Sequence, residues 1–428
     1  MPSDSPTAER AALVGLVTGA RRNLDTGLDE LAGLAEAAGA IVVLRMQQER
    51  ARPDSATFIG SGKVAQLAAA CAELEVDVVI VDNELTPGQL GHLAEKLACK
   101  VLDRTQLILD IFARRARTRE GRLQVELAQL KYLLPRLAGS GTALSRLGGG
   151  IGTRGPGETK LETDRRRIRM RIQAVAEQIE QVRRRRGQLR ERRQKQSVPT
   201  VALVGYTNAG KTTLFNRLTS AHAVTSDALF VTLDPLVRRV RLPDRRELLV
   251  SDTVGFIDRL PHALVAAFRA TLEEVAEADL VLHVIDVASP EQARHRAAVR
   301  RVLEEVGASE VPTLDVHNKI DLVDGDERMR LQSRVPAAVP VSARTGEGVE
   351  ALLRTVAEEL ALDTQRVTVR LAGASEADRR QVARIYQVGR VVSHVTGEGG
   401  VVIEADVPRR FLDRLAPLNV REDFLDAH

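Results

Sequence analysis

Aromatic residues are scarce in this sequence. Tryptophan is absent, and the three aromatic residue types together make up 3% of the 428 residues. Proteins that bind single-stranded nucleic acid without sequence preference stack the bases on aromatic side chains. The scarcity therefore argues against base stacking as the main mode of any nucleic-acid binding.

Cysteine is also rare, with only Cys71 and Cys99, both in the first quarter of the chain and without metal-ligand spacing. This pattern excludes a disulfide framework and predicts buried thiols in a reducing compartment. No apolar run approaches the ~20 residues that a membrane span needs. We expect a cytoplasmic protein without stable membrane insertion.

Hydrophobic residues nevertheless make up 44% of the chain, which is enough for the cores of about three domains. The net charge is only +4, while the sequence pI is 9.2. The placement of the charged residues is therefore more informative than their sum.

A phosphate-binding loop is the strongest single motif. An apolar run at 201–204 precedes it and a helix-compatible run at 213–218 follows it, which is the context that this motif requires. Its glycines let the backbone approach phosphates, Lys211 adds a positive charge, and the Thr212 hydroxyl can ligate Mg²⁺. The predicted nucleotide-binding residues here are Gly205, Tyr206, Thr207, Asn208, Ala209, Gly210, Lys211, Thr212 and Thr213. Alone, the pattern is also compatible with a glycine turn before a helix.

Two later segments have the features of nucleotide-sensing switches. In the first, the Thr232 hydroxyl is expected to be the second hydroxyl ligand of Mg²⁺, and we expect it to be ordered only when a triphosphate is bound. In the second, an apolar strand ends at Asp252, which would hold the Mg²⁺ shell, and the Gly255 N–H could meet a γ-phosphate. Together these segments add Phe230, Val231, Thr232, Leu233, Asp234, Asp252, Thr253, Val254 and Gly255 to the predicted nucleotide site. We predict Lys211, Thr232 and Gly255 as catalytic residues, and Thr212 and Thr232 as metal ligands.

The base-binding motif follows at residues 318–321. A carboxylate at Asp321 can accept both the ring N–H and the exocyclic amine of guanine, whereas adenine offers no such pair of donors. The predicted guanine-binding residues are Asn318, Lys319, Ile320 and Asp321, with Ser342, Ala343 and Arg344 closing over the base. Alone, each polar residue would be interpreted as a solvated loop residue. In this order and spacing, the motifs predict a domain that binds and hydrolyses GTP.

Two positions bear on how hydrolysis would be controlled. Where Ras-like switches place a glutamine that orients the attacking water, this chain has Phe256. A phenyl ring cannot hydrogen-bond water, so intrinsic hydrolysis should be slow until a cation, another group or a partner completes the site. Asn208 could ligate K⁺ beside the phosphates, or could serve only to cap the loop.

The basic residues concentrate between residues 160 and 195, where apolar residues recur at alternating three- and four-residue steps. That spacing is typical of a coiled-coil seam. The seam residues are Leu161, Ile168, Ile172, Val175, Ile179, Val182 and Leu189, and the matching residues upstream are Leu123, Leu127, Leu130, Leu134 and Leu137. We predict an antiparallel hairpin with a glycine-rich tip at 139–158. The hairpin carries many arginines with few acidic residues between them, which favours binding to the phosphate backbone of structured RNA. An acidic protein or an anionic membrane remains the alternative partner.

The sequence thus predicts a multidomain α/β protein with four parts. These are a small parallel α/β domain at 1–104, the basic hairpin at 105–197, a phosphate-loop GTPase domain at 198–363 and a β-α-β-β-α domain at 364–428. In the first part, strands are expected at 41–45, 76–81 and 100–103. Its Gly60–Lys63 stretch lacks full phosphate-loop spacing and is better explained as a helix N-terminus.

At this point the chain resembles the HflX family of ribosome-associated GTPases. The resemblance depends on residues 123–137, 152–164, 205–211, 230–235 and 252–256. It implies a Mg²⁺-dependent GTPase that binds the large ribosomal subunit and its rRNA, with the hairpin tip reaching toward the peptidyl-transferase centre. It also implies ribosome-stimulated hydrolysis and the splitting of stalled or idle ribosomes. We expect a monomer that is partly ribosome-associated.

Two other classes share some of these features. A tRNA-modification-type GTPase would share the Asn208 loop but would need a C-terminal cysteine, and both cysteines lie near the N-terminus. A GTP-regulated adaptor for a protein partner fits the switch motifs but leaves the basic hairpin without a task.

Overall fold

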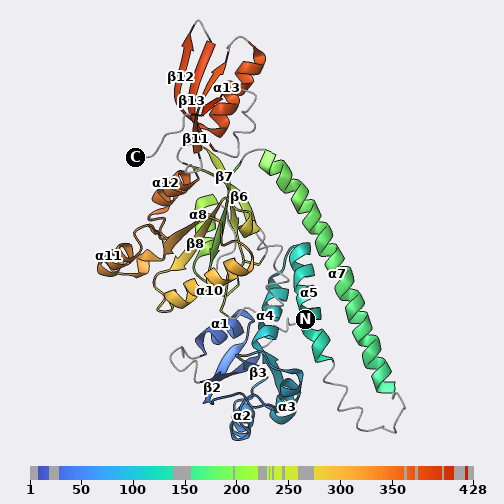
Figure 1. Cartoon of the computed structure of the whole chain (residues 1–428). Coiled ribbons are helices and arrows are strands. Elements are labelled where there is room, and N and C mark those ends of the chain that lie inside the picture. Colours follow the sequence, from blue (N-terminus) through green and yellow to red (C-terminus); the bar gives the residue numbers. More distant parts are fainter. Residues whose placement is uncertain are drawn as a thin grey trace, which may run out of the picture.

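The computed structural model describes residues 8–18, 28–137, 156–195, 198–219, 229–230, 232–233, 236–242, 246–258, 274–360, 364–371, 375–397, 400–408 and 420–422. Three sheets are formed by these residues. Figure 1 shows them in a row, with a long helix along one side. Within the described residues, no helix is both long and apolar enough to cross a membrane. The multidomain α/β architecture that the sequence predicts is confirmed.

The N-terminal sheet has four parallel strands in the order β2-β1-β3-β4. They are β1 (Arg10–Val17), β2 (Ile41–Glu49), β3 (Val78–Val81) and β4 (Lys100–Asp103). Helices α1 (Asp29–Ala37) and α4 (Arg104–Arg115) pack on one face, and α2 (Ser61–Glu73) and α3 (Pro87–Leu97) on the other. The three expected strands are confirmed, and Gly60 is the N-cap of α2. The central strand β1 was not predicted.

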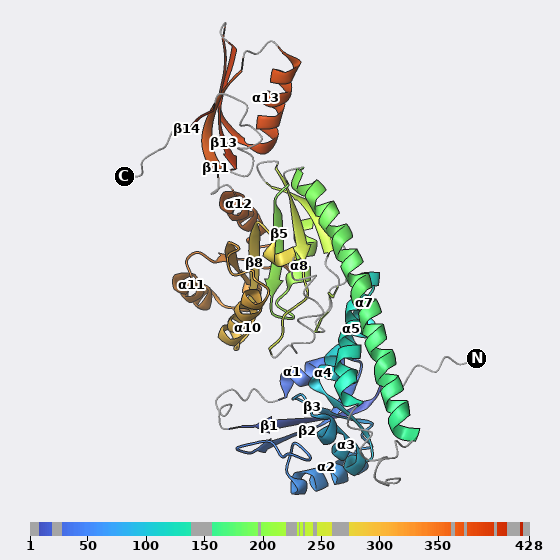
Figure 2. The same ribbon diagram turned by 45° about the vertical axis from the view of Figure 1, so that its right-hand side comes forward.

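The hairpin consists of α5 (Arg119–Arg136) and α7 (Pro156–Lys195), which run side by side in Figures 1 and 2. Leu123, Leu127 and Val175 are buried between them. Arg171 on α7 also donates to Glu126 on α5, with Nε and Oε1 2.6 Å apart. The two helices thus meet through the central part of the predicted seam. Most of the expected glycine-rich tip, up to residue 155, lies outside the described residues.

The central sheet has six strands in the order β10-β9-β8-β5-β7-β6, parallel except for β6. They are β5 (Thr200–Gly205), β6 (Leu236–Arg241), β7 (Glu247–Asp252), β8 (Leu280–Asp286), β9 (Thr313–Asn318) and β10 (Val339–Pro340). The accompanying helices are α8 (Lys211–Thr219), α10 (Gln292–Glu305), the 3₁₀ helix η2 (Ile320–Leu322), α11 (Gly325–Arg334) and α12 (Val349–Glu359). In such open sheets, ligands bind beyond the carboxyl ends of the parallel strands, and the predicted motifs lie there.

The C-terminal sheet is antiparallel, in the order β12-β13-β11-β14. Its elements are β11 (Thr364–Leu371), α13 (Glu376–Val388), β12 (Arg390–Gly397), β13 (Gly400–Pro408) and β14 (Val420–Glu422). The expected β-α-β-β order is confirmed, and β14 was not predicted. The helix expected from Arg409 falls largely outside the described residues. The residue bounds of the four-part division stay a prediction.

Candidate nucleotide-binding site

The phosphate-binding loop runs from the end of β5 into α8, as its spacing predicts. Gly210 has a φ of 91°, and a Cβ atom there would lie 2.2 Å from Asn318 Nδ2. A Cβ atom at Gly205 would lie 2.3 Å from the carbonyl oxygen of Val284. Only glycine fits either position, so the loop passes this close to β8 and β9 because of its two glycines.

A cavity of about 410 Å³ opens beside this loop. Its lining joins residues from the loop, both switch segments and the base-binding motif. The lining residues are Thr207, Asn208, Gly210, Lys211, Thr212, Thr213, Phe230, Thr232, Thr253, Gly255, Asn318, Lys319, Asp321, Leu322, Ala343 and Arg344. The structure therefore brings most of the predicted site residues into one place.

Lys211 lies on the floor of this cavity. Its Nζ atom donates to the carbonyl oxygens of Gly205, at 3.1 Å, and Tyr206, at 2.9 Å. Burial lowers the pKa of Lys211 to about 8, although the nearby Asp252 carboxylate opposes the shift. An ammonium group in so dry a place is strongly attracted to phosphate oxygens.

Three oxygen-bearing side chains meet beside Lys211. The Thr212 hydroxyl donates to Asp252 Oδ2 at 2.7 Å, and Thr232 Oγ1 lies 2.7 Å from Thr212 Oγ1. Burial raises the pKa of Asp252, against the effect of Lys211, and Asp252 Oδ1 is buried without a hydrogen-bond partner. Two hydroxyls and one such carboxylate fit Mg²⁺, which is usually held by few protein ligands together with phosphates and water.

Gly255 lines the cavity next to Lys211. A Cβ atom at Gly255 would lie 2.9 Å from Thr207 Cα and 3.1 Å from Lys211 Nζ, so a side chain there would crowd the loop. The next residue, Phe256, pairs with the loop through its backbone: Thr207 N–H donates to the Phe256 carbonyl at 2.6 Å. The Phe256 ring is buried in the apolar core. It is therefore unable to contact a water molecule in the cavity.

Asn318 connects the two ends of the cavity. Its Nδ2 donates to the Ala209 carbonyl at 2.8 Å, and its Oδ1 accepts from Ala343 N–H at 2.9 Å. Lys319 has a φ of 67°, and its Nζ lies 2.8 Å from Asp286 Oδ2. These contacts hold the base-binding loop against the phosphate-binding loop.

Asp321 is the carboxylate in position to recognise the base. Its Oδ1 accepts from Ser342 Oγ at 2.6 Å, and its Oδ2 forms an ion pair with Arg344. The Ser342 hydrogen bond and the Arg344 charge lower the pKa of Asp321. The side chain is thus an ionised acceptor at neutral pH, as a pair of guanine N–H donors requires.

Several predicted residues direct their side chains away from the cavity. The Tyr206 ring stacks on His295, with centroids 3.7 Å apart, and Leu233 and Val254 are buried in the core. Gly205, Ala209, Asp252, Ile320 and Ser342 adjoin the cavity without being among its lining residues. Val231 and Asp234 lie outside the described residues. Leu322 lines the cavity but was not predicted, although its position directly after Asp321 is a usable signal.

The fold and these motifs define a phosphate-loop GTPase. Three family models match the chain: "GTP-binding GTPase N-terminal" at residues 25–113, "GTP-binding GTPase Middle Region" at 115–193 and "50S ribosome-binding GTPase" at 200–319. Curated GTPase HflX proteins are 45% and 46% identical over more than nine-tenths of this chain, so the chain belongs to the HflX family of GTPases. It therefore hydrolyses GTP, and this family usually uses Mg²⁺.

Curated relatives agree over nearly the whole chain. The GTPase HflX of Caldanaerobacter subterraneus is 46% identical over 411 residues, covering 95% of this chain and 93% of that one. The GTPase HflX of Escherichia coli is 45% identical over 396 residues, covering 92% of each. Among solved structures, a GTP-binding protein from Sulfolobus solfataricus in complex with GDP is 25% identical, with a TM-score of 0.44, covering 82% of this chain and 98% of that one.

Proposed function

We propose that this GTPase binds the large ribosomal subunit and its rRNA through the basic hairpin, and splits or rescues stalled or idle ribosomes. Hydrolysis is stimulated by the ribosome. The protein acts as a cytoplasmic monomer that is partly ribosome-associated. The tRNA-modification-type and adaptor functions are less well supported, because relatives named HflX match more than nine-tenths of the chain.

The exposed arginines of α7 carry this proposal. Arg166, Arg169 and Arg185 are exposed on the helix, whereas Arg183 and Arg184 lie near Glu180, at 3.7 and 3.5 Å. Exposed ion pairs of this kind contribute about 0–1 kcal/mol, so little stability is lost when an RNA phosphate replaces Glu180 as the partner of these arginines. Helix α7 packs on α5 and runs along one side of the molecule (Figure 2), and a long helix with exposed arginines suits a duplex backbone.

The roles proposed for the site residues follow from their positions. Loop N–H groups and Lys211 bind the phosphates, Thr212 and Thr232 ligate Mg²⁺, and the Gly255 N–H meets the γ-phosphate. Asp252 holds the metal's shell from beside Thr212. Mg²⁺, when bound, neutralises the charge that develops on the phosphate oxygens.

The lining of the cavity supports the proposed stimulation by the ribosome. Among the described lining residues, none is a glutamine or histidine that could orient the attacking water, and the Phe256 ring is buried. The chain therefore binds GTP but hydrolyses it slowly until an external group, such as rRNA, completes the site.

K⁺ near Asn208 could supply part of that missing charge. Asn208 is exposed at the cavity and has a φ of 59°. Asparagine is favoured in this left-handed conformation, so loop geometry alone also explains the residue. Hydrolysis that is faster in KCl than in NaCl, with the difference lost in Asn208→Ser, would support the K⁺ site, and equal rates would exclude it.

Cosedimentation with large ribosomal subunits tests the main proposal. We expect full-length protein to pellet with subunits in a non-hydrolysable GTP analogue and to be released in GDP. Deleting residues 139–158 should weaken ribosome-stimulated hydrolysis while leaving GTP binding intact. Equal pelleting in both nucleotides, or none, would contradict the proposal, and size-exclusion chromatography checks the monomer.

A further inference from the structure

The segment that carries Thr232 packs against another domain. Phe230 and Leu233 flank Thr232 and are 1% and 3% exposed. Both belong to the apolar cluster that includes Leu107 and Phe112 of α4, which packs on the N-terminal sheet and is counted here with the N-terminal domain. The polar side of this short segment faces the Mg²⁺ residues, and its apolar side faces α4.

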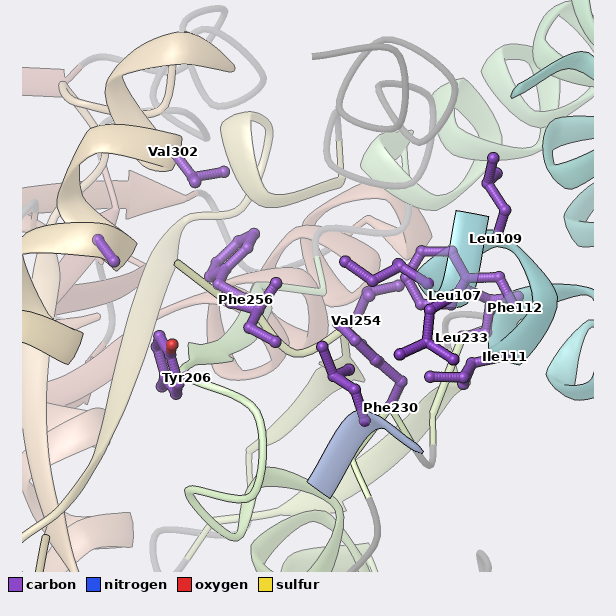
Figure 3. Close-up of a cluster of buried hydrophobic side chains, with 14 of the residues drawn as sticks. Leu107, Leu109, Ile111, Phe112, Tyr206, Phe230, Leu233, Val254, Phe256 and Val302 are labelled. Carbon is purple, nitrogen blue, oxygen red and sulfur yellow. The ribbon is translucent and has the colours of Figure 1, made fainter. Parts of the chain in front are cut away.

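Phe112 is the α4 residue in direct contact with Phe230. The two ring centroids lie 4.7 Å apart, with the ring planes at 83°, which is the edge-to-face arrangement that aromatic pairs favour. Figure 3 shows Leu107, Ile111 and Phe112 gathered with Leu233, next to Phe230. Phe112 itself is fully buried, so this contact is internal packing between two domains.

The backbone of Phe230 depends on this packing. Its φ is 57°, a left-handed conformation that is uncommon for bulky residues and persists only where the surroundings impose it. The Phe230 N–H donates to Thr207 Oγ1 at 3.2 Å, while its ring is held by Phe112. These two contacts set the direction of the chain two residues before Thr232.

The second switch segment packs in the same apolar cluster. Val254 and Phe256, which follow Asp252, are buried in it together with Phe230, and Val254 lies near Phe230 in Figure 3. The Thr232 and Asp252 sides of the proposed metal site therefore share one apolar support. That support extends into α4.

We propose that Phe112 is a positioning residue for the Mg²⁺ site: by packing against Phe230, it holds Thr232 beside Thr212 and favours triphosphate over diphosphate. The inference rests on the proposed role of Thr232 as a metal ligand. Because coupling between two sites is reciprocal, bound Mg²⁺ and triphosphate strengthen the packing of α4 on this segment. Displacing the N-terminal domain weakens their binding.

Phe112→Ala in the full-length protein tests the inference. The measurement is the Mg²⁺ concentration that gives half-maximal binding of a fluorescent, non-hydrolysable GTP analogue, together with the affinity for GDP. We expect about tenfold more Mg²⁺ to be needed, since a large buried ring is lost. The affinity for GDP should change by less than about twofold, because the first switch segment contacts the metal only with a γ-phosphate present. Phe112→Leu keeps most of the apolar contact and should restore most of the binding.

Two further variants serve as controls. Leu67→Ala removes a side chain that is 1% exposed from the cluster on the opposite face of the N-terminal sheet, so the ratio of analogue to GDP affinity should not change. Thr232→Ala should show the same Mg²⁺ defect as Phe112→Ala. The double variant should be no worse than Thr232→Ala alone, because both changes remove one interaction.

The outcomes separate the positioning role from the metal role. A folded Phe112→Ala variant with wild-type Mg²⁺ dependence, beside a defective Thr232→Ala, overturns the positioning role only. Wild-type Mg²⁺ dependence in Thr232→Ala overturns the metal role and this inference with it. If Phe112→Ala does not fold, amide hydrogen exchange in the wild-type protein decides: slower exchange in α4 with Mg²⁺ and the GTP analogue than with GDP supports the inference, because the coupling is reciprocal, and equal exchange overturns it.

Discussion

One end of the cavity lies next to Asp321 and is called the guanine end, because we propose that the base binds there. The other lies next to Lys211 and is called the phosphate end. Contacts within the GTPase domain support the guanine end, whereas the phosphate end is also supported by contacts with the N-terminal domain. At the guanine end, Asn318 bonds to Ala209 and Ala343, and Asp321 bonds to Ser342 and Arg344. These contacts join loops of the same sheet. Recognition of the base should therefore be insensitive to how the domains are arranged.

At the phosphate end, contacts cross between domains. Arg104 of α4 donates to the Asp258 carbonyl at 3.1 Å, and Asp258 N–H donates to the Tyr206 hydroxyl at 2.9 Å. The same hydroxyl contacts Glu30 of α1, which is also paired with Arg104. Together with the Phe112–Phe230 contact, this network places residues of the switch segments at a domain interface. The contacts around the proposed base-binding residues thus stay within the GTPase domain, whereas those around the switch segments extend to α1 and α4.

Breaking the phosphate end should have the largest effect. Lys211→Ala removes the buried ammonium group that faces the phosphates, and we expect kcat for GTP hydrolysis to fall about a hundredfold to a thousandfold. Single-turnover hydrolysis with and without ribosomes measures this fall. Lys63→Ala, in the α2 stretch that only partly matches a phosphate loop, is the control and should leave the rate unchanged. Persisting turnover in Lys211→Ala would place the active site elsewhere.

Breaking the guanine end should change which nucleotide binds and leave the chemistry intact. Asp321→Asn leaves guanine donors facing an amide, and we expect GTP affinity to fall about a hundredfold. Xanthine nucleotide, whose ring offers the reversed pattern, should bind instead. Once bound, XTP should be hydrolysed at the wild-type GTP rate, because Lys211 and Thr232 are untouched. Unchanged GTP affinity in this variant would refute the role of Asp321.

The same division explains what could be predicted from the sequence. The loop at 205–212 and the motif at 318–321 have strict spacing, because glycines and short polar residues must meet a ligand at set positions. The contact of Phe112 with Phe230 joins residues far apart in the chain, and no local pattern encodes such an interface. The central strand β1 was missed because its continuous apolar run lacks the alternation that marks a strand, and such runs do not distinguish strand from helix.

Substitutions in a third region, helix α7, should change the affinity for RNA without affecting either end of the cavity. Replacing Arg183, Arg184 and Arg185 with glutamine removes up to three phosphate contacts from α7. We expect the slope of log affinity against log salt for ribosomal RNA to flatten by up to about three. The matched control replaces three arginines of α11, Arg328, Arg330 and Arg334, and should leave the slope unchanged. An equal effect of both triple variants would mean that only net charge matters.

The smallest expected effect is a pH dependence confined to the phosphate end. Burial holds the pKa of Lys211 at about 8, and bound phosphates should raise it, since they stabilise the ammonium form. Binding is therefore fully favourable only well below pH 8 and weakens as the pH rises through 8 toward the pKa of the complex, because an added proton must be taken up. We expect GTP affinity to fall about fourfold between pH 7 and pH 8.5. Lys211→Arg keeps its charge over this range and should abolish this loss of GTP affinity. A loss caused by deprotonation of the guanine that binds Asp321 would persist in that variant. An identical pH profile for both proteins would show that the loss arises at the guanine end.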